Sequence, residues 1–160
     1  MIQDSGNRRE FGTGAVRDIA EGKGRLDLMP LFEVSCILPS EQGDIISLID
    51  TYVQNGDSSL QEAIELFSVR QFGSIPNAIL EVAKHMEEGC KKYGENNWRK
   101  GIPTHCYIDS GTRHYLKFLR GDNDERHDRA FLWNMMCCLW TVRNLPEMND
   151  LYFAKGGWGD

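Results

Sequence analysis

The sequence lacks a long apolar run, a paired-cysteine motif and a basic excess. No window holds the roughly 18 consecutive apolar residues that a membrane-spanning helix needs, and the polar N-terminus lacks the core of a signal peptide. The five cysteines are odd in number and form no C-x-x-C pair, which argues against a zinc ribbon or a disulfide scaffold. These absences predict a cytoplasmic protein that does not enter a membrane.

The charge balance argues against binding to duplex nucleic acid. The net charge is −6 and the isoelectric point is near 5.2, whereas proteins that bind duplex DNA usually carry a basic excess. A local basic cluster can still hold a small anionic ligand in an acidic protein. With 160 residues, of which 41% are apolar, the chain is long enough for one domain with a real core.

Helical periodicity predicts an all-α protein, because apolar residues recur at helical spacing and no stretch alternates like a strand. We expect a small helical bundle whose core spans residues 75–143, with an extended N-terminal arm at 1–25, a helical hairpin at 44–69 and a tail at 144–160, of which the last residues, 156–160, are loose. Start and stop signals predict helices at 30–37, from Asp44 to about Gln54, from Ser58 to 69, from Ser74 to Gly94, at 105–119, and at 125–143 after an Asp124 cap. A polar break separates the first two, at 39–43.

The arm is rich in glycine and charge and shows no hydrophobic period. One interpretation is a flexible segment. The other is an arm that folds over a ligand, in which Arg17, Lys23 and Arg25 bind phosphate.

Two stripes run along the helix expected between Ser74 and Gly94. The predicted buried stripe is Ile75, Ile79, Val82, Met86 and Cys90. The other stripe is polar and consists of Glu81, His85 and Glu88, flanked by Lys84, Lys91 and Lys92. An ordinary amphipathic helix shows similar charges.

Two polar side chains are expected on apolar helix faces. His114 shares its face with Tyr107, Gly111 and Phe118, and is either a satisfied core histidine or a ligand. Gly111 within a helix costs roughly 1 kcal/mol relative to alanine, which suggests that another element or a ligand comes close. Asn134 lies on a helix that is apolar almost all round, so it needs a partner such as Glu81, His114 or a ligand.

These groups suit a site for a metal ion and a phosphate. Glu81, Glu88, Glu125 and Asp128 could hold magnesium or manganese, and a metal-activated water would then attack a phosphoryl group. Alternatives stay open for several of them. Glu125 and Asp128 could instead favour a helix N-terminus, the Glu62/Glu65 pair could hold the cation or be solvated surface acids, and Trp98 could cover a base or fill the core.

Several strings together resemble the dATP/dGTP diphosphohydrolase family of phages and prophages, which is similar to the all-α MazG-like nucleotide pyrophosphohydrolases. They lie at 11–18 (Phe-Gly-Thr-Gly-Ala-Val-Arg-Asp), 22–30, 91–103 (Lys-Lys-Tyr-Gly followed by Asn97 and Trp98) and 113–114, and in the spacing of His127 and Asn134. The resemblance implies that a purine deoxynucleoside triphosphate is hydrolysed to the monophosphate and pyrophosphate with Mg²⁺ or Mn²⁺. It also implies an oligomer in the cytoplasm of a phage host, and the hairpin at 44–69 looks like an insertion.

The metal motif departs from the MazG-like pattern of E-x-x-E followed by E-x-x-D, because Lys84 stands where the second acid would be and Glu88 is the nearer replacement. Residues and resemblance together give three sets of predicted site residues. The catalytic set is Glu81, His114, His127 and Asn134; the metal set is Glu81, Glu88, Glu125 and Asp128; and the set for substrate and phosphate is Arg17, Lys23, Arg25, Lys91, Lys92, Tyr93, Asn97, Trp98, Arg113 and Lys117.

Three alternatives remain at this point. The incomplete set of carboxylates is compatible with a protein that sequesters a nucleotide without cleaving it. The hairpin and the tryptophan-rich last helix are compatible with a helical interaction protein. A Cys–His nucleophile, such as His105 with Cys106, ranks low because nothing in the sequence clearly activates a thiolate there.

Overall fold

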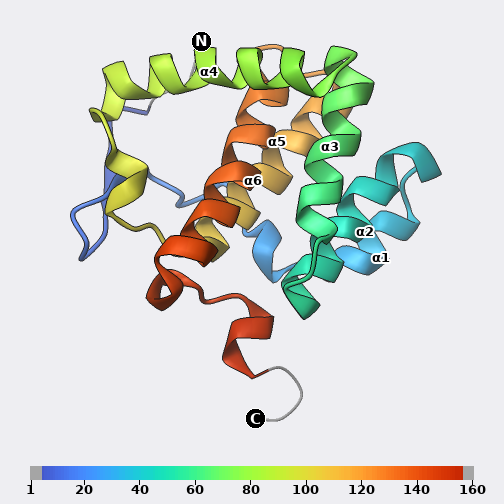
Figure 1. Cartoon of the computed structure of the whole chain (residues 1–160), viewed down its shortest axis with the longest axis horizontal. Helices are drawn as coiled ribbons and strands as arrows, with labels where there is room; N and C mark the ends of the chain where they lie inside the picture. Colours follow the sequence, from blue (N-terminus) through green and yellow to red (C-terminus); the bar gives the residue numbers. More distant parts are fainter. Residues whose placement is uncertain (1–4, 157–160) are drawn as a thin grey trace.

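The computed structural model describes residues 5–156 and is mostly helical, which confirms the predicted all-α class (Figure 1). Within those residues the α-helices are α1 Leu31–Cys36, α2 Ser40–Asn55, α3 Ser59–Phe72, α4 Ile75–Tyr93, α5 Thr104–Arg120 and α6 His127–Asn144. Short 3₁₀ turns connect or follow them: η1 Leu26–Leu28, η2 Asn97–Lys100, η3 Pro146–Met148 and η4 Tyr152–Lys155. No described helix is long and apolar enough to cross a membrane.

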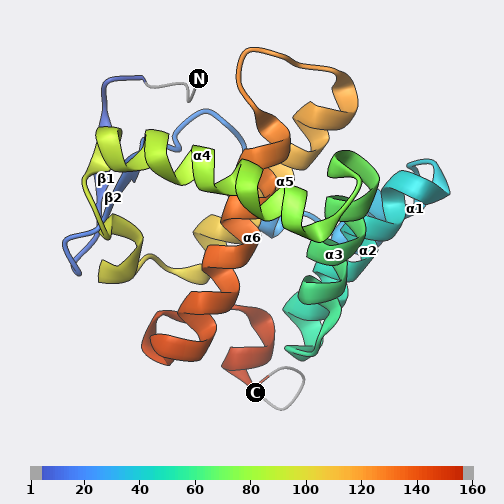
Figure 2. The ribbon, with the colours of Figure 1, turned by 45° about the horizontal axis from the view of Figure 1, so that its top comes forward.

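The N-terminal arm forms a small antiparallel hairpin that the sequence did not predict. Strands β1 Arg8–Glu10 and β2 Val16–Asp18 pair with Arg9 opposite Arg17, and they lie beneath the C-terminal part of α4 (Figure 2). Strands of three residues are too short to show alternation. The Asn97 side chain holds β2 in place, since its amide donates to the Val16 carbonyl and accepts from the Val16 N–H, both at 2.8 Å. This part of the arm is therefore folded onto the bundle.

The ends of α4 are as the sequence predicts. The Ser74 hydroxyl accepts a hydrogen bond from the Asn77 N–H at 3.2 Å, Pro76 occupies the first turn, and Gly94 ends the helix with φ of 84°. These are the usual signals for a helix start and stop.

Two helix starts differ from the prediction. Helix α2 begins at Ser40, so most of the polar break at 39–43 is its first turn, in which Gly43 packs closely against Ser35 of α1. Its apolar period starts only at Ile45, which explains why this turn was missed. Helix α6 begins at His127 after Arg126, so Asp124 does not cap it.

Helices α5 and α6 pack along each other at the centre of the molecule (Figure 1). Gly111 permits this contact, because a Cβ there would lie 2.1 Å from Met135 Cε and 3.2 Å from Asn134 Cβ. The expectation that another element approaches Gly111 is confirmed. On the other side, Phe67 of α3 packs edge to face against Phe131 at 4.9 Å and Phe118 at 5.2 Å between ring centroids, which attaches the hairpin of α2 and α3 to the core.

Helix α4 crosses the bundle instead of lying along it (Figure 1). Val82 is buried, but Ile75 and Ile79 are 39% and 53% exposed, so the predicted buried stripe is wrong at these two positions. A helix that crosses its neighbours contacts them over only part of its length, and periodicity does not reveal the crossing angle.

The tail is ordered where it is described. Asp150 joins it to the start of α5, since its carboxylate accepts hydrogen bonds from the His105 N–H at 2.9 Å and the Thr104 hydroxyl at 3.1 Å. Residues 144–156 of the tail are thus held against the bundle, whereas residues 157–160 of the end predicted to be loose lie outside the described part of the chain.

Candidate functional site

A pocket of about 410 Å³ opens between the N-terminal arm with its β1–β2 hairpin, α4, η2 and the facing sides of α5 and α6. It receives side chains from segments that are far apart in the sequence. Seven of the predicted substrate residues line it: Arg17, Lys23, Tyr93, Asn97, Trp98, Arg113 and Lys117. His114, Glu125 and Asn134, from the catalytic and metal sets, line it as well.

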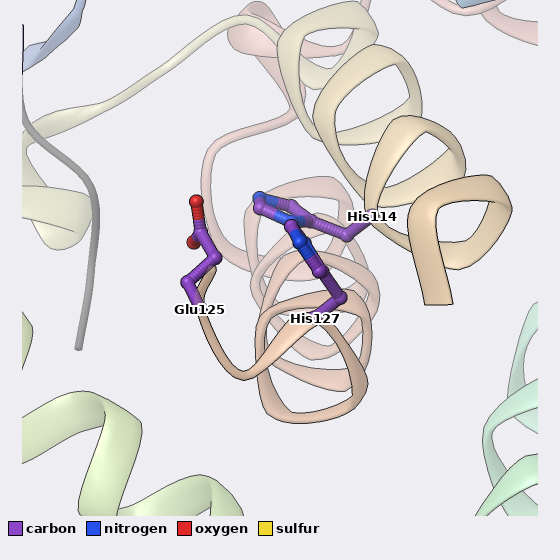
Figure 3. A group of neighbouring side chains, drawn as sticks. All are labelled: His114, Glu125 and His127. Atoms are coloured by element: carbon purple, nitrogen blue, oxygen red, sulfur yellow. The ribbon is translucent and has the colours of Figure 1, made fainter. Parts of the chain in front are cut away.

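A group of ligand-type side chains lies at one side of the pocket: His114, Glu125 and His127 (Figure 3), of which His114 and Glu125 line the pocket and His127 is buried behind them. Their nearest nitrogen and carboxylate oxygen atoms all lie within 4.8 Å of one another, and the two Nδ1 atoms of the histidines are 2.9 Å apart. His114 comes from the middle of α5, His127 is the first residue of α6, and Glu125 lies in the loop between them. The α5–α6 packing thus creates the group.

Asp124 determines which nitrogen of His127 is available. Its carboxylate lies 2.7 Å from Nε2 of His127, so that nitrogen is the one that carries a proton. The Nδ1 atom of neutral His127 is then bare and faces His114. A carboxylate behind a histidine is the usual support of an imidazole that binds a metal.

Burial keeps His114 in the state that binds a cation and makes a charged Glu125 costly unless a cation is near. Burial, followed by the neighbouring His127, holds the pKa of His114 well below its usual value, so this imidazole is neutral at physiological pH. Burial also raises the pKa of Glu125. A positive ion between them would offset the cost of a buried carboxylate charge.

A second group of possible ligands uses the other side of His127 and consists of Asp122, Asp124 and His127. Asp122 is already bound by the Arg120 guanidinium through both carboxylate oxygens. This compensation makes the second group the weaker candidate for a cation.

Arg17 is a half-buried cation without a carboxylate partner among residues 5–156. Its Nη2 donates to Oδ1 of Asn134 at 3.1 Å, whereas its Nη1 is buried and bonds to nothing in that part of the chain. The guanidinium lies over the rings of Tyr107 and Trp133, with 5.2 and 5.9 Å to their centroids. A guanidinium at a pocket wall with one buried, unsatisfied nitrogen is expected to take an anion.

The other cations of the pocket are compensated to different degrees. Lys23 pairs with Asp18 at 3.1 Å, and Arg113 pairs with Asp109 at 2.7 Å. Lys117 has no carboxylate within ion-pair distance in the described segment. Arg9 also lines the pocket without a carboxylate partner among residues 5–156, and its Nε is buried and unsatisfied. Of the predicted phosphate residues, Arg17 and Lys117 are therefore the strongest candidates.

Comparison with known families agrees with this combination of groups. The family model for the dATP/dGTP diphosphohydrolase N-terminal domain matches residues 57–151, which is more than half of the chain. The chain belongs to this family. No curated protein and no solved structure matches it. The name of the family indicates hydrolysis of a nucleotide, and hence an enzyme.

The match to the diphosphohydrolase family covers the whole histidine group but not the arm. Arg17 and Lys23 come before residue 57, so the pocket combines family residues with side chains from outside the matched range. The match begins between α2 and α3, inside the hairpin predicted as an insertion at 44–69. That insertion stays a prediction.

Two of the predicted metal ligands lie away from the pocket and already have partners. Glu81 accepts from Arg129 at 2.7 Å and from Lys84 at 3.0 Å, and these contacts lower its pKa. Asp128 is bound by Arg126 at 3.0 Å. The structure thus does not gather the predicted carboxylates into one site.

The other predicted residues outside the pocket lining are Glu88, Arg25, Lys91, Lys92 and His127, of which His127 lies behind the lining residue His114. Arg25 is paired with Asp27 through two hydrogen bonds of 2.8 and 2.7 Å. Of the predicted metal set, only Glu125 is brought to the histidines.

Asn134 and Asn97 have structural partners that the sequence did not indicate. Asn134 donates to the Ala130 carbonyl at 2.8 Å and accepts from Arg17, so neither Glu81 nor His114 is its partner. Asn97 uses its whole amide on Val16 of β2. Both residues hold the arm against the core.

The remaining wall of the pocket is aromatic and neutral. Trp98 packs edge to face against Trp140 at 4.8 Å and also lines the pocket, so it fills the core and forms part of the wall. His85 lies 5.5 Å from the Trp133 ring, and burial lowers its pKa to about 4, which leaves it uncharged.

Sequence reasoning missed Asp124, which it interpreted as a helix cap, and left His85 and Arg9 outside the predicted site. The spacing of Asp124 and His127 was visible in the sequence, since residues three apart in a tight turn can contact each other.

Proposed function

We propose that this protein hydrolyses purine deoxynucleoside triphosphates to the monophosphate and pyrophosphate with the help of a divalent cation. One observation carries the proposal: a single pocket is lined by His114 and Glu125, which form a group of cation ligands with the buried His127 behind them, and by Arg17 and Lys117, which have no carboxylate partner among residues 5–156. A nucleoside triphosphate with its metal ion is a ligand that satisfies both.

The donor set favours manganese over magnesium. Magnesium prefers oxygen ligands almost exclusively, whereas manganese also accepts imidazole. The group contributes two imidazoles and one carboxylate, and Asp124 fixes the bare nitrogen of one of them. Bound there, the ion would polarise a phosphoryl oxygen and lower the pKa of a water molecule.

Other side chains at the site would bind the phosphates and keep His127 in the tautomer that binds the ion. Arg17 would direct its unsatisfied Nη1 to a phosphate oxygen, and Lys117 would neutralise a second one. Asp124 would hold the proton on Nε2 of His127 throughout. The α–β phosphoanhydride bond would break, water would add to the α-phosphorus, and pyrophosphate would leave.

The second candidate is a protein that binds nucleotides without cleaving them. The neutralisation of Glu81 and Asp128 by arginines favours it, because it leaves the histidine group with one carboxylate. A binding protein needs the cations and the aromatic wall, and it needs no activated water.

The test is product analysis with dGTP, dATP and dCTP, in the presence of Mn²⁺ or Mg²⁺. We expect the purine monophosphate and pyrophosphate, with more product in Mn²⁺, and a large loss in Glu125→Gln. Glu62→Gln is a matched control on the exposed side of α3, and it also tests the alternative Glu62/Glu65 cation pair.

Binding of dGTP that is recovered intact under every metal condition would exclude the hydrolase and support the second candidate. Orthophosphate, or inorganic triphosphate with the free nucleoside, would show that a different bond is cut. The homo-oligomer stays a prediction, which light scattering on the purified chain checks.

A further inference from the structure

The α-helices of the described chain contain three interior glycines: Gly43 in α2, Gly89 in α4 and Gly111 in α5. Glycine inside a helix is destabilising relative to alanine, so each position calls for a reason. Close packing is the reason at two of the three positions, Gly43 and Gly111. A Cβ at Gly43 would lie 2.2 Å from the Ser35 carbonyl oxygen, and one at Gly111 would lie 2.1 Å from Met135 Cε.

Gly89 has no such reason within the protein. A Cβ there would meet nothing within 4 Å, and its backbone is ordinary helix that any residue adopts. The position faces the pocket, in the middle of the stripe through which α4 lines it. The backbone of α4 at Gly89 is therefore accessible to a ligand in the pocket.

The neighbours of Gly89 shape this surface. His85 precedes it by about one helical turn and Tyr93 follows it by about one turn, and both line the pocket. Eight residues of helix span about 12 Å along the axis, so two rings bracket a strip of bare backbone.

The charge distribution indicates which part of a nucleotide lies there. Helix α4 contributes no lysine, arginine or carboxylate to the pocket lining within residues 5–156. The cations of the lining and the histidine group come from the arm, from α5, from the loop before α6 and from the start of α6. Phosphates belong with those groups, which leaves the α4 surface around Gly89 to the planar, uncharged base; the cations next to this surface, Arg8 and Lys92, lie over the Tyr93 ring at 4.9 and 5.2 Å from its centroid.

We propose that Gly89 forms the floor of a subsite for the purine base, on which the base lies against the bare backbone of α4 between His85 and Tyr93. This inference rests on the proposed function, since it places one end of the nucleotide whose other end occupies the cation side. A side chain at position 89 would take the volume that the base occupies.

The test combines stability and kinetics in Gly89→Ala and Gly89→Leu. Alanine should raise Tm by roughly 2–4 °C, because it favours the helix and meets no other atom. The same change should raise KM for dGTP about threefold, and leucine should raise KM roughly tenfold or more, with a much smaller effect on kcat. Inhibition by inorganic tripolyphosphate, which has no base, should change less than about twofold in both variants.

Ala83→Gly is the matched control, because Ala83 is exposed on α4 outside the pocket. It should lower Tm and leave KM for dGTP unchanged. A change in helix stability alone would then not explain a higher KM in the Gly89 variants.

The outcomes separate this inference from the proposed function. Hydrolysis by the wild type with an unchanged KM in Gly89→Leu overturns the base subsite and leaves the hydrolase standing. An equal loss of tripolyphosphate inhibition also overturns the subsite. Wild-type protein that binds dGTP without hydrolysing it, together with weak dGTP binding by Gly89→Leu, supports the subsite and removes the hydrolase. Wild-type protein that neither binds nor hydrolyses dGTP removes both.

Discussion

Removal of the Asp124 carboxylate tests the metal site most directly. Asp124 lies behind His127, 2.7 Å from its Nε2, and the structure assigns it the task of keeping the proton on that nitrogen. In Asp124→Ala the imidazole loses this partner, so its other tautomer becomes populated and its Nδ1 carries a proton. Protonated Nδ1 cannot bind a cation, and Mn²⁺ affinity should fall.

The magnitude follows from where the two side chains lie. The Asp124 side chain is 49% exposed and that of His127 is 1% exposed, so solvent weakens the Coulomb attraction of the carboxylate for an ion. The main effect is then on tautomer and ring orientation. Loss of such a partner typically weakens metal binding 10- to 100-fold, or about 1.4–2.7 kcal/mol.

Calorimetric titration of the purified variants with Mn²⁺ measures this loss. Asp124→Asn keeps an acceptor for the Nε2 proton and should lose less affinity than Asp124→Ala. Asn123→Ala, an exposed neighbour in the same loop, is the matched control and should bind like the wild type. Asp122→Asn separates the two groups, because only the group of Asp122, Asp124 and His127 depends on it.

Two results would refute the reasoning. One is Mn²⁺ affinity in Asp124→Ala within twofold of the wild type, with clear loss in His127→Ala. The other is a loss in Asp122→Asn as large as that in Asp124→Ala, which would move the ion to the opposite side of His127.

Three further predictions concern the arm, the core and the tail. Arg17→Met should raise KM for dGTP roughly 10- to 100-fold, because a charge-assisted hydrogen bond is worth about 1.5–3 kcal/mol. The circular dichroism spectrum should not change. An unchanged KM would show that Arg17 does not bind the phosphates. Gly111→Ala should lower the free energy of unfolding by about 1–2 kcal/mol in urea titrations, since its Cβ would overlap Met135, and a more stable variant would contradict this close packing. The hydrogen bond to Asp150 raises the pKa of His105 from its ordinary value of 6.5 to about 10. The stability that this pair contributes is therefore complete below pH 6.5 and declines as pH rises through about 10. Because both side chains are about one-third exposed, we expect a contribution of only about 1–2 kcal/mol, which Asp150→Asn should abolish together with this pH dependence in urea titrations.

Local signals in the sequence determined the helices and some of their contacts. A capping serine before a proline and a terminal glycine set the ends of α4, because the groups that satisfy a helix terminus lie within a few residues of it. Gly111 likewise indicated a close contact between helices, because a residue without a side chain lets another helix approach the backbone. The diphosphohydrolase family was also recognisable from strings of residues that the structure later placed around one pocket.

Only the tertiary structure decided which charged groups form the site. Glu81, Glu125 and Asp128 look alike in the sequence, but Arg129 and Arg126 neutralise two of them and the third meets the histidines. Helical spacing tells which residues share a face, not which neighbour that face meets or at what angle. Three features depend on contacts between segments distant in the chain, which exist only once the chain has folded: the counter-charge of a carboxylate, the guanidinium of Arg17 without a carboxylate partner among residues 5–156, and the open space at Gly89.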